Sequence, residues 1–268
     1  MWVTLMIDLH SHLLPGIDDG SKSLQESLKM ARIYEKAGYG QVVATPHWVP
    51  GTSWMPTPGE IRVQVASLNQ RIKDEGINLS VLPGMEIALD PKIPPLLDEE
   101  KLQPLGETSY VLIETPFQIL PLGWEQVFVA IASRGYTVLL AHPERCAQLV
   151  DKPMLFDGFI EKGIYLQINW DSFLGYHGRE AARLARYLAA KGYIHCLATD
   201  SHDADNRHAG NVQRAAREVE NLVGPKNLQL LARENPARVL GGEPLAPMSR
   251  QNPQDTPKSK RRLFFGYR

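Results

Sequence analysis

Five histidines and four carboxylates follow short apolar segments of this chain, and they are residue types that bind divalent metal ions. The nine residues are His10, His12, Asp19, His47, Glu86, Glu114, His142, Asp200 and His202. A donor set of imidazole and carboxylate without thiolate is typical of catalytic zinc, manganese or iron rather than of a structural zinc site. One ion accepts about four to six ligands, so the set predicts two or three ions.

Two of the patterns have a local geometric reason. His10 and His12 form an H-x-H pair, and side chains two positions apart point the same way in an extended chain. Asp200 and His202 repeat the spacing. Taken alone, the H-x-H pair fits two polar residues in a surface turn as well as it fits metal binding.

The other signals are weak one by one. The acidic loop from Gly16 to Gly20, which contains Asp19, has the composition of an ordinary turn, and a lone histidine after a strand, such as His47, is usually structural. A carboxylate after a buried strand, as at Glu86, is costly unless it is paired or coordinated. Only the joint placement of all nine residues favours a metal centre over nine separate structural explanations.

Two arginines extend the pattern toward phosphate chemistry. Arg145 follows His142 by three residues, and Arg207 follows His202 by five. A guanidinium fork matches phosphate oxygens, although a surface ion pair explains either arginine equally well on its own. Neighbouring ions activate water and neutralise phosphoryl charge. The combination predicts hydrolysis of a phosphate ester, with Arg145 and Arg207 as catalytic residues that hold phosphoryl oxygens.

Strand-like segments precede these residues and must position them. Seven strands are predicted, at residues 3–7, 41–45, 79–83, 110–113, 137–141, 164–170 and 195–199. Predicted helices lie at residues 24–37, 58–75, 124–133, 154–162, 179–191, 211–222 and 227–233, with an irregular segment or a short helix within 91–105.

The strands are almost continuously apolar, which indicates a wholly parallel α/β sheet covered on both faces. Strand ends of one polarity share a face of such a sheet, so ligands from six of the seven strands would meet there. An open, doubly wound sheet draws ligands to one switch point from a few strands. The distribution therefore favours a closed barrel of seven βα units over the open sheet.

The bulk composition indicates one globular domain. The chain has 268 residues, 43% of them hydrophobic and 22% charged, with a net charge of −1. Residues 1–242 are predicted to form the barrel. Residues 243–268 are basic and proline-rich, and are predicted to be a disordered tail. The remaining body is acidic, which argues against nucleic acid as a partner.

Several negative observations narrow the function and the location. Neither Cys146 nor Cys196 begins a Cys-x5-Arg motif, which excludes a cysteinyl-phosphate mechanism, and the phosphate-binding-loop and G-x-S-x-G signatures are missing. Two cysteines make no disulfide framework, and the chain shows neither a signal-peptide pattern nor a run of 18 apolar residues. A cytoplasmic location is expected.

Longer motifs resemble a known superfamily. DLHSHLLPGIDDGSKS, TPH, GMEI, IET, HPER and TDSH resemble the polymerase-and-histidinol-phosphatase (PHP) superfamily over about residues 6–240. The combination of DDG after H-x-H with HPER is closest to the bacterial capsule and exopolysaccharide tyrosine phosphatases. The resemblance implies a distorted (β/α)7 TIM-like barrel (the PHP fold) and a metal-dependent phosphomonoesterase acting on phosphotyrosine in protein.

The resemblance also implies cofactors and a partner. It implies two to three divalent ions, most often Mn²⁺, with Fe or Zn as alternatives. By position, the three ligand sets are His10, His12, Glu86 and Asp200; Glu86, Glu114 and His142; and Asp19, His47 and His202. Arg145 and Arg207 match the phosphate-binding arginines of the family. The implied substrate is the C-terminal tail of a bacterial tyrosine autokinase that regulates capsule or exopolysaccharide synthesis.

Three alternatives remain open. The same chemistry could act on a small phosphate ester such as histidinol phosphate, or on nucleic acid as a PHP nuclease. A protein with the same metal centre could also be a non-catalytic scaffold that docks the kinase. Membrane contact is expected only through the partner or through the basic tail.

Overall fold

Buried aliphatic runs form the strands of the protein, whose computed structural model describes residues 5–249. One sheet has the order β1-β2-β4, with β1 Met6–Ser11, β2 Tyr39–Ala44 and β4 Ser80–Pro83. The other has the order β3-β5-β6-β7-β8-β9, with β3 His47–Trp48, β5 Glu86–Ala88, β6 Tyr110–Glu114, β7 Thr137–Ala141, β8 Tyr165–Asn169 and β9 Cys196–Ala198. Every pairing is parallel, as the apolar strands predict.

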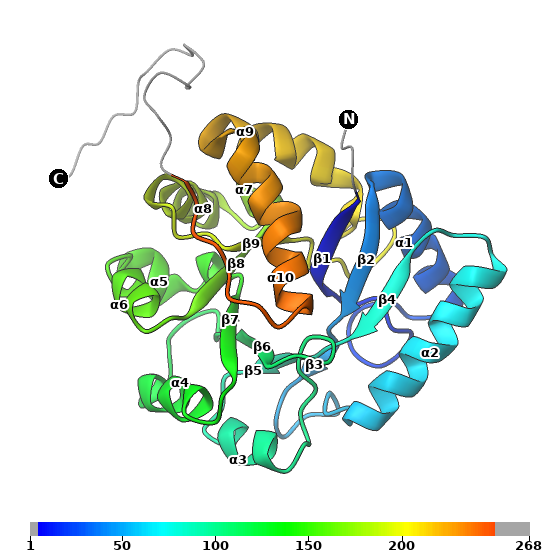
Figure 1. Ribbon diagram of the computed structural model, residues 1–268, viewed down its shortest axis with the longest axis horizontal. Helices are drawn as coiled ribbons and strands as arrows, with labels where there is room; N and C mark the ends of the chain where they lie inside the picture. The colour runs from blue at the N-terminus through cyan, green and yellow to red at the C-terminus, as the bar shows by residue number, and fades with distance from the viewer. Residues whose placement is uncertain (1–4, 250–268) are drawn as a thin grey trace.

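The two sheets are parts of one ring, because two barrel strands are interrupted. β3 continues β2 beyond Pro46, and β5 continues β4 beyond Gly84, so each pair fills one position of the barrel. A Cβ on Gly84 would lie 2.5 Å from Val43, so only glycine allows this close approach. The nine strands therefore fill seven positions around the ring, which is the distorted (β/α)7 arrangement that the sequence predicts (Figure 1).

The first and last strands close the ring. The backbone N–H of Asp200 donates to the carbonyl of His10 (3.0 Å), and that of His12 donates to the carbonyl of Ser201 (2.8 Å). Closure brings both ligand-bearing motifs, H-x-H and D-x-H, to the same carboxyl end of the barrel.

Asp8 joins the two closing strands through its side chain. Its Oδ1 accepts from the backbone N–H of Thr199 (3.0 Å), and its Oδ2 accepts from the hydroxyl of Tyr34 (2.8 Å) and from that of Thr199. Burial raises the pKa of Asp8 to about 6, although these hydrogen bonds oppose the rise. The buried carboxylate is thus fully partnered, and it holds β1 against β9.

Replacing Asp8 should therefore weaken the fold. Asp8→Ala removes the acceptor of Thr199 N–H and of the hydroxyls of Tyr34 and Thr199, and of these two hydroxyls only one can then donate to the other (2.6 Å). We expect the free energy of unfolding to fall by about 3 kcal/mol. Urea denaturation at fixed metal content measures the change. Tyr34→Phe removes a single hydroxyl and should lower it by about 1 kcal/mol. Coincident unfolding curves for Asp8→Ala and the unmodified protein would refute the closing role of this carboxylate.

Helices surround the ring of strands (Figure 1). They are α1 Leu24–Ala37, α2 Pro58–Asp74, α3 Ile93–Asp98, α4 Trp124–Ala132, α5 Ala147–Asp151, α6 Leu155–Glu161, α7 Trp170–Phe173, α8 Arg179–Lys191, α9 Val212–Gln229 and α10 Asn235–Leu240. A capping box between Thr57 and Glu60 starts α2, and Ser23 caps α1. Each helix packs an apolar stripe on the barrel, as Met30, Ala31 and Tyr34 of α1 illustrate.

The structure contains the short helices α5 and α7, which the sequence does not predict, and its first strand lies later in the chain than predicted. The first strand, predicted at 3–7, is Met6–Ser11, so the H-x-H pair begins inside it. An apolar pattern cannot show this, because His10 and Ser11 are buried polar residues. The helices predicted at 211–222 and 227–233 share the label α9, but Gly224 has non-helical backbone (φ 77°, ψ 162°) and separates α9 into two helical parts, as predicted. The second part begins at Pro225 and continues through a π segment, η3 Leu230–Glu234, into α10.

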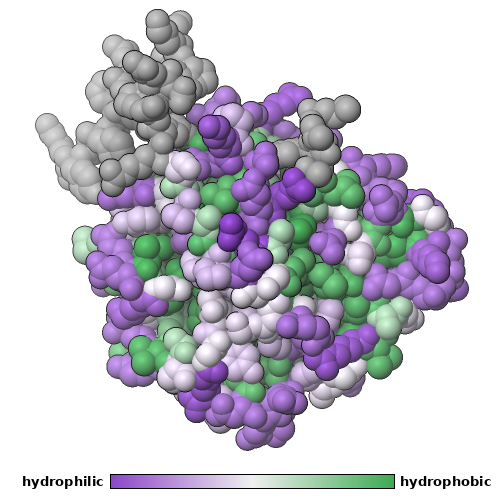
Figure 2. All heavy atoms as spheres, in the orientation of Figure 1, coloured by the Kyte–Doolittle hydropathy of each residue, from purple (hydrophilic) through white to green (hydrophobic). Residues whose placement is uncertain are grey.

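The domain boundary at 242 stays a prediction, and the residues just beyond it contact the rest of the chain. Glu243 to Ser249 lie against the body: the Tyr110 hydroxyl donates to the carbonyl of Glu243 (2.6 Å), and Asn235 exchanges two hydrogen bonds with Ala246 (2.9 Å each). This segment and α10 lie on the face shown in Figures 1 and 2, where polar and apolar side chains are interspersed. The rest of the predicted tail, residues 250–268, lies outside the described residues.

Between residues 5 and 249, the structure contains no helix that is both long enough and apolar enough to cross a membrane.

Candidate metal centre

All nine predicted ligands lie in one cluster at the carboxyl end of the barrel. Their donor atoms fall into four groups, each within 4.8 Å: His12, Asp19, His47 and His202; His10, Glu86 and His142; His10, His12 and Asp200; and His47, Glu86 and Glu114. The predicted third set, Asp19, His47 and His202, lies within one of these groups, which also contains His12. The groups share members, so the cluster is continuous rather than three separate sites.

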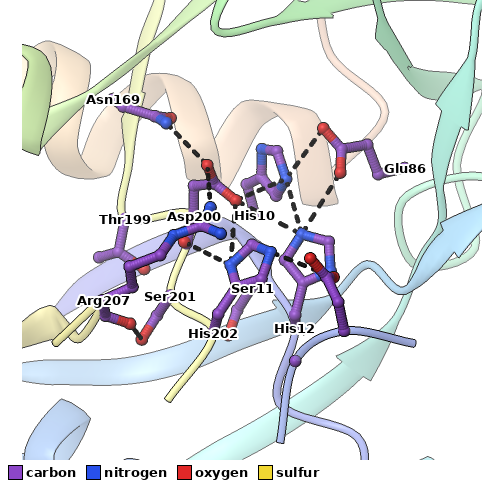
Figure 3. A network of polar contacts seen from close by, with 12 residues as sticks. His10, Ser11, His12, Glu86, Asn169, Thr199, Asp200, Ser201, His202 and Arg207 are labelled. Carbon is purple, nitrogen blue, oxygen red and sulfur yellow. Dashed lines mark hydrogen bonds and ion pairs between the residues drawn. The ribbon is translucent and has the colours of Figure 1, made fainter. Parts of the chain in front are cut away.

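Glu86 is at the middle of the cluster. Its Oε1 lies 2.9 Å from His142 Nε2 and 3.3 Å from His10 Nε2. Its Oε2 lies 2.8 Å from His47 Nδ1 and 3.3 Å from His12 Nε2. The first residue of β5 thus faces imidazoles from three other strand positions, which is the arrangement expected of a bridging carboxylate. Figure 3 shows Glu86 facing His10 and His12.

Three of the histidines are held from the side away from the cluster. Their Nδ1 contacts are His10 with Gln167 Oε1 (2.9 Å), His12 with Asp18 Oδ2 (2.7 Å) and His202 with the carbonyl of Asp200 (2.9 Å). These contacts leave Nε2 of each ring free to face the carboxylates. Histidines that bind metals are typically oriented in this way.

Asp200 faces both the imidazoles and the arginines. Its Oδ1 lies 3.5 Å and 3.4 Å from the Nε2 atoms of the two histidines of the H-x-H pair. Its Oδ2 accepts from Arg145 Nη1 (2.8 Å), Arg207 Nη2 (3.0 Å) and Asn169 Nδ2 (2.9 Å). Both predicted phosphate-binding arginines therefore lie at the edge of the candidate metal cluster. Figure 3 shows Arg207 and Asn169 beside Asp200.

Two of the candidate ligands have an unusual backbone conformation. His142 has a φ of 28° and Asp200 a φ of 52°, and Glu100 is the one other non-glycine residue with positive φ among residues 5–249. Such conformations cost about 1–3 kcal/mol each and are commonly found at functional sites. His142 follows β7 directly and Asp200 lies two residues beyond the end of β9, and both side chains enter the cluster.

The charges in the cluster suit bound cations, although protonated imidazoles can also offset the carboxylates: despite burial, which lowers it, the negative charges of Glu86 and Asp200 raise the pKa of His10 to about 9. Burial, and then the negative charges of Glu86 and Asp200, raise the pKa of Glu114 to about 8. Burial lowers the pKa of His142 to about 4, so this imidazole is neutral near pH 7, the state that coordinates a metal. Three carboxylates in one pocket repel each other unless positive charge is added, and a divalent ion supplies it.

Unpartnered atoms give an independent test of whether the residues fit metal ions. Nine buried side-chain atoms in the described part of the chain make no hydrogen bond, and three of them are Asp19 Oδ1, His47 Nδ1 and Glu86 Oε2. His47 Nδ1 and Glu86 Oε2 lie 2.8 Å apart, but without hydrogen-bond geometry. All three belong to predicted ligands, and buried polar atoms normally have partners. The imidazole and carboxylate donors therefore suit manganese, iron or zinc.

Sequence analysis missed several residues that orient the ligands. Gln167 and Asn169 come from β8, the one predicted strand without a candidate ligand, and contact His10 and Asp200. Polar residues two positions apart in an apolar strand were the available signal. Asp18 was also missed, because sequence alone does not show which acid of the Asp18–Asp19 pair orients a histidine.

One glycine of this loop is required by packing. A Cβ on Gly20 would lie 2.2 Å from the carbonyl oxygen of His12, so any other residue would displace the H-x-H segment. The DDG sequence thus places Asp18 against His12 Nδ1 and Asp19 within 3.4 Å of His47 Nε2 and His202 Nε2.

The family profile described as "Capsular polysaccharide synthesis, CpsB/CapC" matches residues 6–241. The chain is 34% identical to tyrosine-protein phosphatase YwqE of Bacillus subtilis (strain 168) over 262 residues, covering 98% of this chain and 100% of that protein. It is 27% identical over 246 residues to tyrosine-protein phosphatase CpsB of Streptococcus pneumoniae, covering 88% of this chain and 98% of that protein.

Solved structures are also similar to this chain. A crystal structure from work on YwqE and CpsB, described as unique metal-dependent tyrosine phosphatases, superposes with a TM-score of 0.84 at 33% identity, covering 91% of this chain and 100% of that chain. A lactonase from Listeria monocytogenes superposes with a TM-score of 0.56 at 13% identity, covering 88% of this chain and 94% of that chain, which is a likeness of fold alone.

Proposed function

The chain belongs to the CpsB/CapC family of capsular polysaccharide synthesis, and from this premise we propose that it is a metal-dependent phosphatase that hydrolyses phosphotyrosine in proteins. The contacts of Asp200 are the main structural support for this phosphatase activity. One oxygen of this carboxylate faces the imidazole cluster and the other accepts from both Arg145 and Arg207. A phosphoryl group placed there meets metal ligands on one side and two guanidinium groups on the other.

The nine clustered side chains would hold two or three divalent ions, with Mn²⁺ as the first choice and Fe or Zn as alternatives. The unpartnered atoms of Asp19, His47 and Glu86 and the absence of thiolate donors support this set. The chemistry that such ions supply is activation of water and withdrawal of charge from the phosphoryl group.

The residues of the chain supply positioning. Arg145 and Arg207 can each present two N–H groups to the non-bridging oxygens of the phosphate. Asn169 donates a hydrogen bond to Asp200. This bond would keep the carboxylate in place while Arg145 and Arg207 bind the phosphate. The leaving phenolate of tyrosine has a pKa near 10 and departs more readily than an alkoxide, so the site requires no strong general acid.

The proposed substrate protein is a bacterial tyrosine autokinase, recognised through its C-terminal tail, in the regulation of capsule or exopolysaccharide synthesis. The family description and the naming of relatives as tyrosine-protein phosphatases support this choice. A cytoplasmic location fits Cys146 and Cys196, which are buried and unpaired. Membrane contact would then come through the partner or through the basic tail.

A panel of substrates tests the proposal. With manganese-loaded protein, we expect kcat/KM for a phosphotyrosyl peptide to exceed that for the matching phosphoseryl peptide and for histidinol phosphate by about tenfold or more. The reverse order, with histidinol phosphate turned over fastest, would replace the proposal by the small-ester alternative. Degradation of single-stranded DNA at comparable rates would favour the nuclease alternative instead.

A further inference from the structure

An aromatic ring lies beside the proposed phosphate site. Phe117 follows β6, and the Arg145 guanidinium carbon lies 4.7 Å from its ring centroid. The rings of Phe117 and His142 are nearly parallel, with an interplanar angle of 27° and centroids 6.3 Å apart. Phe117 thus contacts a proposed phosphate-binding residue and faces a proposed metal ligand.

Hydrogen bonds fix the backbone of Phe117, although much of its side chain is exposed to solvent. The carbonyl of Phe117 accepts from Ala147 N–H (2.8 Å), and that of Gln118 accepts from Gln148 N–H (3.0 Å), so the loop is bound to α5. The Gln148 side chain accepts from Leu120 N–H (2.7 Å). Phe117 nevertheless remains 47% exposed. An apolar ring is therefore held at the mouth of the site with a surface available for contact.

From this placement we propose that Phe117 packs against the phenyl ring of the substrate and makes the site selective for aryl phosphates. The inference rests on the proposed function. In phosphotyrosine a single oxygen joins phosphorus to the ring, so a phosphate bound by Arg145 brings that ring to the residue stacked on Arg145. Phosphoserine presents only a methylene there and leaves Phe117 uncovered. Aromatic pairs attract each other beyond the area they bury.

Other exposed apolar residues fit this role less well. Ile119 and Leu122, in the same loop, are 67% and 101% exposed, so neither packs toward the site. Trp54 stacks on His47, with centroids 5.4 Å apart, and His47 neighbours Asp19 and Glu86 rather than the arginines. Among residues 5–249, Phe117 is the one aromatic ring on which Arg145 or Arg207 stacks.

Direct binding to the manganese-loaded full chain tests the inference without relying on turnover. Benzylphosphonate and methylphosphonate share the anionic group and differ in the ring, and calorimetry gives a dissociation constant for each. Phe117→Ala should weaken benzylphosphonate binding about tenfold and leave methylphosphonate binding within about twofold. Phe117→Tyr should retain the ring preference, and Phe117→Leu should lose it while keeping apolar volume. Leu122→Ala is the matched control and should change neither constant.

The possible failures can be told apart. If Phe117→Ala weakens both ligands equally, or neither, then Phe117 does not contact the ring and the inference is overturned, while the proposed function stands. If the unmodified protein binds neither phosphonate, the phosphate site itself is absent and the proposed function fails together with the inference.

Discussion

We expect chelation of divalent cations to abolish phosphotyrosine hydrolysis by this protein, and added manganese to restore it. The physical reason is the negative charge of Glu86, Glu114 and Asp200, which lie together in the cluster. Burial and the charges of Glu86 and Asp200 raise the pKa of Glu114 to about 8. Without cations, no group among the nine can activate water and also balance a doubly charged phosphate. We expect turnover to fall at least about 1,000-fold in excess chelator.

The measurement combines a rate with a metal count. Hydrolysis of a phosphotyrosyl peptide is followed before chelation, after chelation and after addition of manganese, while elemental analysis gives ions bound per chain. Protein passed through the same buffer exchange without chelator is the control. Undiminished turnover in a sample found free of metal would rule out the proposed mechanism.

Replacing Arg145 by lysine should cost about 100-fold in kcat/KM for a phosphotyrosyl peptide, with bound metal unchanged. Lysine keeps the positive charge, but it cannot present the two parallel N–H groups that the guanidinium offers to phosphate. Arg145 is well placed for this role because its Nη1 lies 2.8 Å from Asp200 Oδ2, at the edge of the cluster.

Arg134→Lys is the matched control, because Arg134 pairs with Asp98 on the surface away from the cluster. Its kcat/KM should stay within about twofold of the unmodified value. The measurement also separates an enzyme from a scaffold, because a protein that only docks a kinase does not need the guanidinium of Arg145 to bind phosphate. Wild-type turnover in Arg145→Lys, and also when Arg207→Lys is added, would show that neither arginine holds the phosphate.

The sequence predicts the barrel well because strand and helix periods are both clear. The apolar runs locate all seven barrel positions, and the nine candidate ligands lie in one cluster as predicted. What the apolar pattern does not predict is where a strand continues through buried polar residues, as β1 does through His10 and Ser11. The same limit hides β3 and β5, which begin at the candidate ligands His47 and Glu86.

Residues that act through another residue are the hardest to predict. Asp8 and Gln167 are buried, and each contacts a partner far away along the chain, which spacing alone does not predict. Asp8 and Thr199 lie 191 positions apart, and Gln167 and His10 lie 157 apart. Polar residues within an apolar strand are candidates for orienting a ligand, but only the folded structure shows which ligand each of them contacts.

The closure of the ring through Asp8 and Thr199 also sets the time at which the centre is completed during protein synthesis. These two residues are 191 positions apart, and at about 5–20 residues per second the second one is made roughly 10–40 seconds after the first. Until then the first two histidines have neither Asp200 nor the last strand beside them. The complete set of nine candidate ligands is therefore available only once the chain has been made through His202.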